Sequence, residues 1–270
     1  MRIRVINPNT TQSMTEDIGA AARAVAASGT EIVAVSPAMG PASIEDHYDE
    51  AFSAIGVIDE VRKGEAEGCD GYVIACFGDP GLMAARELAR GPVVGIAEAA
   101  MHTACLISSG FAVVTTLART RPLIEHLVGA YGMRRLCRCV RTTDIAVLEL
   151  KEPASHARRA IVAECRKAMM EDHADCVVLG CAGMADLQRS LADELGIPVI
   201  DGVAAAVKLI EGLVAQGLRT SKAGALAYPL PKAYSGAFAT HAPRSGSGPG
   251  HGVTPLRGPQ SFRRPPGTPG

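Results

Sequence analysis

The chain has 270 residues, of which 47% are hydrophobic and 20% charged, a composition typical of globular proteins that bury a sizeable core. Its 27 Lys and Arg residues are balanced by 28 Asp and Glu residues, so no basic excess points to nucleic acid or to an anionic membrane surface. No apolar run is long enough to span a bilayer and the N-terminus has no secretory layout, so we expect a cytoplasmic protein with reduced thiols.

Short β-branched runs alternate with helical patterns along the chain, which predicts an α/β fold built from parallel-type sheets flanked by helices. The expected strands are 3–6, 31–35, 72–76, 92–96, 111–115, 136–140, 177–181 and 198–200. The expected helices are 15–27, 48–67, 82–89, 97–108, 121–131, 155–172, 185–195 and 203–216. The strands are nearly continuous apolar runs, as expected where helices cover both faces of a sheet.

An internal repeat is the most informative feature of the sequence. Asp70 begins an apolar strand that ends at Cys76, and Asp175 begins a second strand that ends at Cys181, 105 residues further on. A turn of small residues, a helix and a strand that starts at a proline follow each cysteine. Two halves of the same plan predict two lobes related by an approximate two-fold axis, with a cleft between them.

The predicted domain organisation follows this repeat. We expect a first α/β lobe from residues 1–96 plus 205–240 and a second from residues 97–204. Residues 241–270 contain seven Gly, seven Pro and four Arg with no acidic residue, so we expect a disordered tail.

Two matched cysteines at strand ends indicate a specific chemistry. Ligands of parallel α/β sheets bind beyond the carboxyl ends of the strands, so Cys76 and Cys181 are predicted to face one cleft from opposite sides. Such a pair can remove a proton from one face of a carbon and deliver one to the other, which is racemisation or epimerisation. The helix expected after each cysteine can favour the thiolate form.

The same strand ends offer hydrogen-bond donors for the negative charge of a carbanion intermediate. The candidates are Asn7, Asn9, Thr10, Thr115 and Thr116, with the backbone N–H groups of Gly78, Asp79, Ala182 and Gly183. No Arg or Lys occupies these positions, so the predicted cleft is polar and neutral. This disfavours a free dicarboxylate or a phosphate as the ligand.

Other functions have weaker support. Cys137 and Cys139 form a Cys-x-Cys pair with no second ligand pair at a useful spacing, so no metal site is predicted. Glycine-rich nucleotide-binding motifs are absent from the sequence. A cysteine hydrolase would need a base beside one thiol, yet the histidines are scattered over helical stretches. One of them, His47, lies in an acidic stretch that fits either a solvated helix start or a lid over the cleft. A hydrolase or a non-catalytic binding protein explains at most one of the two cysteines.

At these residues the sequence resembles the aspartate/glutamate racemase superfamily and, within it, the hydantoin racemase family, which includes allantoin racemases. The resemblance covers residues 1 to about 238. It rests on the stretches 5–10, 40–45, 74–81, 113–116, 179–184 and 198–202. Ala182 and Gly183 follow the second cysteine where glutamate racemases carry Thr-His, which is consistent with a different substrate.

The resemblance implies a cofactor-independent proton transfer at C5 of a 5-monosubstituted hydantoin, or of allantoin by the same mechanism. Cys76 and Cys181 would be the two bases, and a homo-oligomer is expected from the relatives. The ring would lie against Asn9, Gly78, Asp79, Thr115, Thr116, Ala182 and Gly183. Met39 would lie in the pocket for the C5 substituent, where a flexible thioether suits varied apolar groups.

Overall fold

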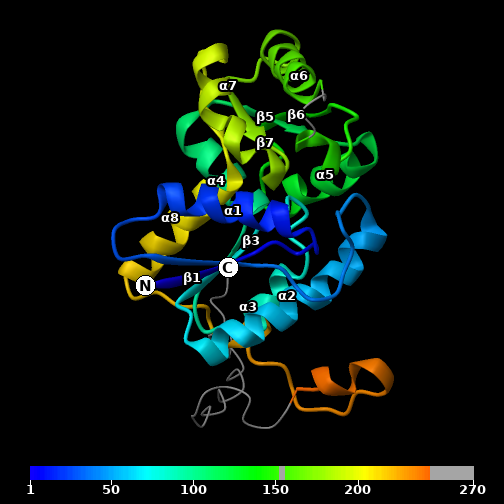
Figure 1. The fold of residues 1–270 in the computed structure, drawn as a ribbon. Helices are drawn as coiled ribbons and strands as arrows, with labels where there is room; N and C mark the ends of the chain where they lie inside the picture. Colours follow the sequence, from blue (N-terminus) through cyan, green and yellow to red (C-terminus); the bar gives the residue numbers. More distant parts are fainter. Residues whose placement is uncertain (152–155, 244–270) are drawn as a thin grey trace, which may run out of the picture. The chain divides into compact units, whose positions relative to one another are not determined.

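Two parallel four-stranded sheets form the framework of the computed structural model, which describes residues 1–151 and 156–243. The first sheet has the order β2 (Glu31–Val35), β1 (Arg2–Ile6), β3 (Gly71–Ile74) and β4 (Val93–Gly95). The second has the order β6 (Cys137–Thr142), β5 (Phe111–Thr115), β7 (Cys176–Leu179) and β8 (Val199–Ile200). Two parallel sheets flanked by helices (Figure 1) confirm the predicted α/β fold. The strand order is equivalent in the two sheets, as the sequence repeat predicts.

The helices lie around and between these sheets. Their bounds are α1 Gln12–Val25, α2 His47–Glu67, α3 Leu82–Leu88, α4 Ile96–Ile107, α5 Arg121–Ala130, α6 Ala157–Glu171, α7 Gln188–Leu195 and α8 Gly202–Ala215. Helix α4 contacts both sheets, and α8 contacts α4, α1 and the first sheet. These two helices therefore join the lobes through a shared core.

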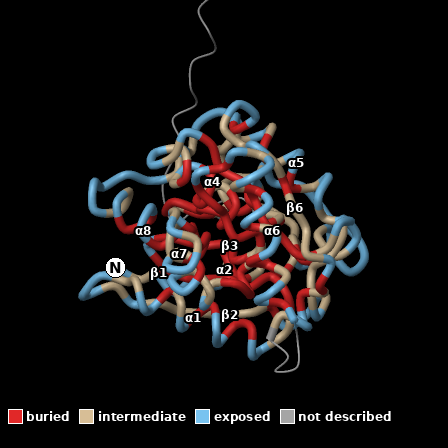
Figure 2. Tube along the Cα trace, turned by 90° about the horizontal axis from the view of Figure 1, so that it is seen from above, coloured by how far each residue is buried: buried red, intermediate tan, exposed pale blue. Residues whose placement is uncertain are grey.

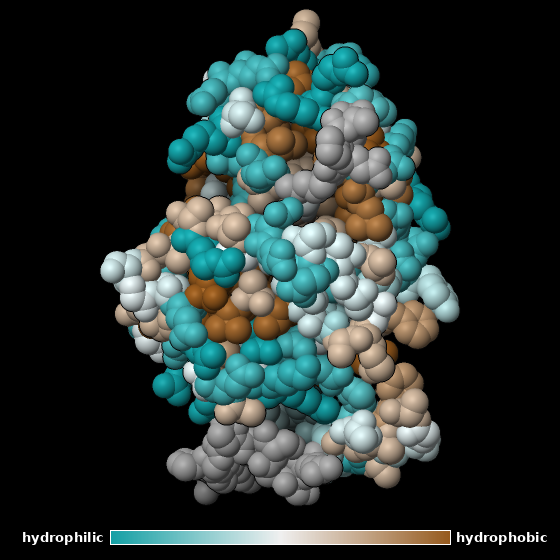
Figure 3. Space-filling model, in the orientation of Figure 1, coloured by the Kyte–Doolittle hydropathy of each residue, from teal (hydrophilic) through white to brown (hydrophobic). Residues whose placement is uncertain are grey.

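The shared core contains residues of both lobes. Val5 and Val73 of the first sheet belong to the same buried cluster as Val113 and Val178 of the second, with Met101 of α4 among them. Figure 2 shows the buried residues gathered at the centre of the chain's trace. On the face seen in Figure 3, apolar side chains form separate patches among polar ones. Continuous burial across both sheets keeps the strand ends of the two lobes in fixed positions.

The described residues fall into two parts, residues 1–227 and the segment that starts at Tyr228. The second part contains the short 3₁₀ helix Gly236–His241, in which the rings of Phe238 and His241 meet edge to face. The predicted disordered tail lies outside the described residues from 244 onward. The lobe boundaries stay a prediction.

One expected helix differs in kind. The segment predicted as a helix over 185–195 consists of a 3₁₀ helix, Ala182–Leu187, followed by α7. Its first residues continue directly from Cys181, whose backbone is extended (φ −158°, ψ 136°). The tighter i→i+3 hydrogen bonding begins at once, since the N–H of Met184 donates to Cys181 O at 3.1 Å.

The two repeat aspartates hold equivalent strand starts together. Asp70 Oδ2 accepts a hydrogen bond from the N–H of Arg2 at the start of β1. Asp175 accepts from the N–H groups of Ser109 and Gly110, just before β5, at 3.0 and 2.9 Å. These N–H groups hold the pKa of the Asp175 carboxyl below its usual value. The repeat thus places structural acids at one end of the sheets and thiols at the other.

We expect Asp175→Ala to lower the free energy of unfolding by about 1 kcal/mol, because two backbone donors lose a shared acceptor. Urea unfolding checks this, with the exposed Asp193→Ala, whose side chain has no recorded hydrogen bond among the described residues, as the matched control. The difference from wild type should shrink below about pH 4, as the wild-type carboxylate takes up a proton. Equal stability of the two variants at neutral pH would contradict this role.

Candidate active site

Cys76 and Cys181 line one cavity between the two lobes, at the carboxyl ends of β3 and β7. The backbone delivers them in the same way: the residue before each cysteine donates its N–H to the adjacent strand, Ala75 to Ile6 O and Gly180 to Val114 O, both at 2.8 Å. In this conformation the cavity volume is about 60 Å³, room for a few water-sized groups.

Burial dominates the electrostatics of Cys76. Desolvation raises the pKa of its thiol to about 12, although the N–H of Gly78 donates to the sulfur and opposes the shift. Negative charge on Cys181 raises the Cys76 pKa further, which indicates that the two sulfurs interact. The expectation that a helix N-terminus favours the thiolate is wrong for Cys76, because α3 begins only at Leu82, after a turn.

Polar side chains from the ends of β1 and β5 complete the floor of the cavity. Asn9 Oδ1 accepts from Asn7 Nδ2 and from the N–H of Thr11, both at 2.9 Å. The oriented amide lines the cavity, and its Nδ2 donates one hydrogen bond to Met14 Sδ at 3.6 Å, which leaves its second N–H. Thr115 Oγ1 donates to Gly180 O at 2.9 Å. Among the described residues no partner is recorded for Thr116 Oγ1, which lines the cavity. Asn9 and Thr116 therefore keep donors for a ligand.

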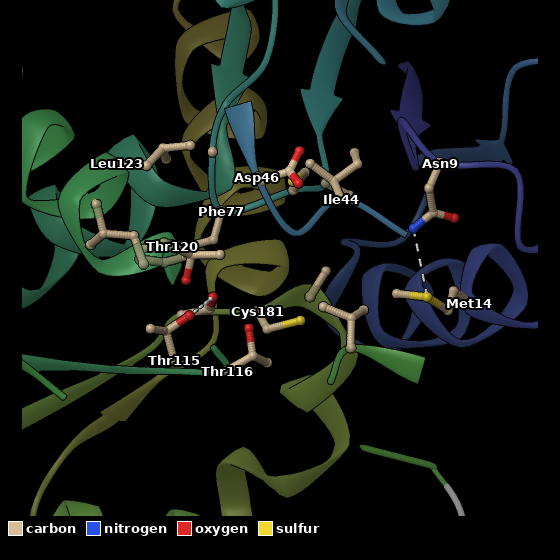
Figure 4. Close-up of a pocket in the computed structure, with 17 residues that line it drawn as sticks. Asn9, Met14, Ile44, Asp46, Phe77, Thr115, Thr116, Thr120, Leu123 and Cys181 are labelled. Carbon is tan, nitrogen blue, oxygen red and sulfur yellow. Dashed lines mark hydrogen bonds between the residues drawn. The ribbon is translucent and has the colours of Figure 1, made fainter. Parts of the chain in front are cut away.

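An apolar wall surrounds these groups and was missed by sequence reasoning. Figure 4 shows Thr115, Thr116 and Cys181 facing Phe77, Asp46 and Ile44 across the cavity. The other large apolar side chains of the lining are Met14, Leu123, Ile124 and Val147, and Ala75 and Ala182 contribute small ones. Ile44 belongs to the recognised stretch 40–45 and had a signal in the sequence. Phe77 likewise belongs to the recognised stretch 74–81, whereas Met14, Leu123, Ile124 and Val147 come from helices and a loop that carry no motif.

The expectation of an uncharged cleft needs one correction. Asp46, at the start of α2, lines the cavity. Its Oδ2 lies 3.0 Å from Nη2 of Arg119 in the other lobe, and its Oδ1 accepts from the N–H of Asp49. The carboxylate is thus paired within the protein, so the site still offers no free cation for a dicarboxylate or phosphate.

Asp79 does not line the cavity, in contrast to the expectation that it contacts the substrate ring. Its buried carboxylate accepts from the N–H groups of Ala97 and Glu98 at the start of α4 and from the hydroxyl of Tyr131 at 2.7 Å. Burial raises the pKa of Asp79 to about 7. Its N–H donates to Cys76 O at 3.0 Å, so Asp79 fixes the turn that carries Cys76.

The structure brings most, though not all, of the other predicted binding residues to the cavity. Gly78, Thr115, Thr116 and Ala182 line it together with Asn9. Gly183 is outside the lining, but a Cβ placed there would lie 3.6 Å from Cys181 Sγ. Met39 is 69% exposed and outside the lining, because the loop after β2 turns its side chain to solvent.

The rest of the described chain offers no second centre of this kind. The eight cysteines are all free thiols. Among residues 1–151 and 156–243, no group of three or more His, Cys, Asp or Glu side chains is placed to hold a metal ion. In the same residues, every helix is too short or too polar to cross a membrane.

Comparison with known proteins gives a consistent result. The profile of the family described as Asp/Glu/Hydantoin racemase matches residues 3–210. The hydantoin racemase of Pseudomonas sp. (strain NS671) is 51% identical over 88% of this chain and 96% of its own, and that of Rhizobium meliloti is 50% identical over 87% and 98%. The allantoin racemase from Klebsiella pneumoniae is 55% identical and superposes with a TM-score of 0.88. The match covers 90% of this chain and 100% of the Klebsiella chain.

The raised pKa of Cys76 makes its alkylation strongly pH-dependent. Because only the thiolate reacts, we expect the rate of Cys76 labelling by iodoacetamide to rise about tenfold per pH unit between about pH 7 and 10. Peptide mapping by mass spectrometry measures it. The same peptide in the unfolded chain serves as the control and should level off near its ordinary pKa of about 8.5. A plateau below pH 9 in the folded protein would contradict the assignment.

Asp79 should weaken the fold as its carboxyl ionises. Its pKa is about 7 in the folded protein and about 3.9 in the unfolded chain, so the folded state binds more protons between these values and loses stability as pH rises through them. We therefore expect the free energy of unfolding of Asp79→Asn, minus that of wild type, to increase from about pH 4 to pH 7. Urea unfolding at several pH values tests this, and a difference that falls over this range would refute it.

Proposed function

Because the chain belongs to the Asp/Glu/Hydantoin racemase family and is a racemase, we propose that it inverts C5 of 5-monosubstituted hydantoins with Cys76 and Cys181 as its two bases. The observation that carries the proposal is the placement of both thiols in one cavity from equivalent strand ends of two lobes. The proposed reaction needs no cofactor, and the enzyme would act as a cytoplasmic homo-oligomer.

The proton moves in two steps. The thiolate of one cysteine takes the C5 proton from one face of the ring and becomes a thiol. The electron pair of the broken C–H bond delocalises into the adjacent ring carbonyl as an enolate. The thiol of the other cysteine then delivers its proton to the opposite face and becomes the thiolate, so the roles of the two residues are exchanged at the end of each turnover.

The cavity provides donors for the enolate oxygen. Thr116 Oγ1 and Asn9 Nδ2 both lie on its polar side, and the Asn9 amide is held in orientation by Asn7 and Thr11. Pre-oriented donors in a water-poor site stabilise developing negative charge without reorganisation. We assign these two side chains to the ring carbonyl.

Desolvation makes the Cys76 thiolate a stronger base. A Cys76 pKa of about 12 leaves little thiolate in the empty site, but the thiolate that forms has a high proton affinity. A C–H bond beside a carbonyl is weakly acidic, so transfer is easier to a base of comparable proton affinity. In the reverse direction, the same raised pKa keeps Cys76 protonated and able to donate its proton.

Two named substrates fit this chemistry. The relatives from Pseudomonas and Rhizobium are hydantoin racemases, whereas the Klebsiella structure is an allantoin racemase. Allantoin is itself a 5-substituted hydantoin, so the reaction at C5 is shared and the wall around the substituent decides the preference. A cysteine hydrolase is less favoured, since the described cavity lining contains no histidine to activate a single thiol.

The two-base proposal predicts opposite defects in Cys76→Ser and Cys181→Ser. Each variant should lose racemisation by at least about 10²- to 10⁴-fold. In D₂O, each should still exchange the C5 proton of one enantiomer, without inversion, because the remaining thiol serves one face. Proton NMR and circular dichroism on pure enantiomers of a 5-substituted hydantoin and of allantoin measure both effects.

Cys137→Ser, which changes a thiol outside the cavity, is the matched control and should keep full activity. Wild-type rates in either Cys→Ser variant would overturn the proposal. A ring-opened product from the wild-type enzyme would assign the chain to hydrolysis instead.

A further inference from the structure

The loop before α2 lines the cavity with Ile44 and Asp46 and is hydrogen-bonded to both lobes. Its residues 40–46 are called the strap here. At its first end, Thr10 donates its N–H to Pro41 O at 2.9 Å, and Thr11 Oγ1 donates to Ala42 O at 2.7 Å. These contacts anchor the strap beside Asn9, on its own lobe. At its other end the strap reaches the second lobe.

Two contacts join the strap to the second lobe. Glu45 Oε1 accepts from the N–H of Val147 at 2.9 Å, and Asp46 Oδ2 pairs with Arg119 at 3.0 Å. The receiving side is itself braced, since Asp144 Oδ1 accepts from the N–H of Ala118 and so joins the two loops that carry Val147 and Arg119. The strap therefore closes against a preformed surface.

The strap also contributes to the wall of the cavity. Ile44 and Asp46 line it from the strap, and Val147 lines it from the second lobe. The contacts of Glu45 with Val147 and of Asp46 with Arg119 thus fix the position of Ile44. Cys181 lines the same cavity from the end of β7. An apolar side chain at this point sets how much space remains for a group attached to the reacting carbon.

We propose that the strap closes over the bound substrate and that Ile44 determines which C5 substituents the enzyme accepts. This inference rests on the proposed racemase reaction and extends it to the choice between small and bulky substituents. The strap must open so that substrate and product can exchange. The contacts of Glu45 and Asp46 with the second lobe are few enough to break and re-form. Arg119 is 63% exposed and Asp46 26% exposed in their side chains, so their pair is weak and screened by salt.

The test compares kcat/KM for pure enantiomers of 5-methylhydantoin and 5-benzylhydantoin, followed by circular dichroism. Ile44→Ala should raise the benzyl-to-methyl ratio about tenfold, since it removes the side chain that limits the space. Arg119→Gln should shift the ratio in the same direction by about two- to threefold, because a weaker contact with the second lobe holds Ile44 less firmly. Arg121→Gln is the matched control: it removes a charge from the start of α5, where Arg121 pairs with Glu125 and does not line this cavity.

Salt gives a test that needs no variant. Sodium chloride at about 0.5 M, which screens exposed pairs, should raise the ratio for wild type and leave it unchanged for Arg119→Gln. An unchanged ratio in a folded Ile44→Ala, or in Ile44→Val if the alanine variant does not fold, would overturn the inference. So would identical behaviour of Arg119→Gln and Arg121→Gln. Failure of wild type to racemise either hydantoin would instead overturn the proposed function.

Discussion

The carboxyl ends of two parallel sheets meet at one cavity, and the proposed chemistry depends on that geometry. Each sheet places a central pair of strands side by side, β1 with β3 and β5 with β7. Each pair delivers polar residues from one strand and a cysteine from the next, so the two lobes offer the cavity similar sets of groups. A reaction that needs a proton acceptor on one face and a donor on the other is matched by this symmetry.

Burial has opposing effects on such a site. Excluding water strengthens hydrogen bonds to a developing enolate, but it also disfavours the thiolate, as the raised pKa of Cys76 shows. A second buried acid lies beside Cys76. Asp79 holds the turn that carries Cys76 against α4, and burial raises the pKa of its carboxyl to about 7. Stability is thus given up near the site in exchange for a fixed position of the thiol.

The repeat explains why so much could be predicted from the sequence. Its aspartates and cysteines mark the two ends of equivalent strands, and the apolar runs located the strands of both sheets to within a few residues. The pairing of Cys76 with Cys181 in one cavity followed from topology alone. Residues outside the repeat could not be placed in this way: Leu123 and Val147 reach the cavity through tertiary packing, and Met39 turns away from it. Asp79 lies in a recognised stretch, yet only the structure shows that its carboxylate faces α4 rather than the ligand.

The most direct test of two separate bases follows wild-type enzyme in D₂O at low conversion of a pure enantiomer, either of a 5-substituted hydantoin or of allantoin. Mass spectrometry after chiral separation compares deuterium in the inverted product with deuterium in the remaining substrate. We predict that the product carries solvent deuterium at C5 while the substrate keeps its protium, because one thiol removes the proton and the other delivers a different one. Product that retains the original protium, passed across by a single group, would contradict the account.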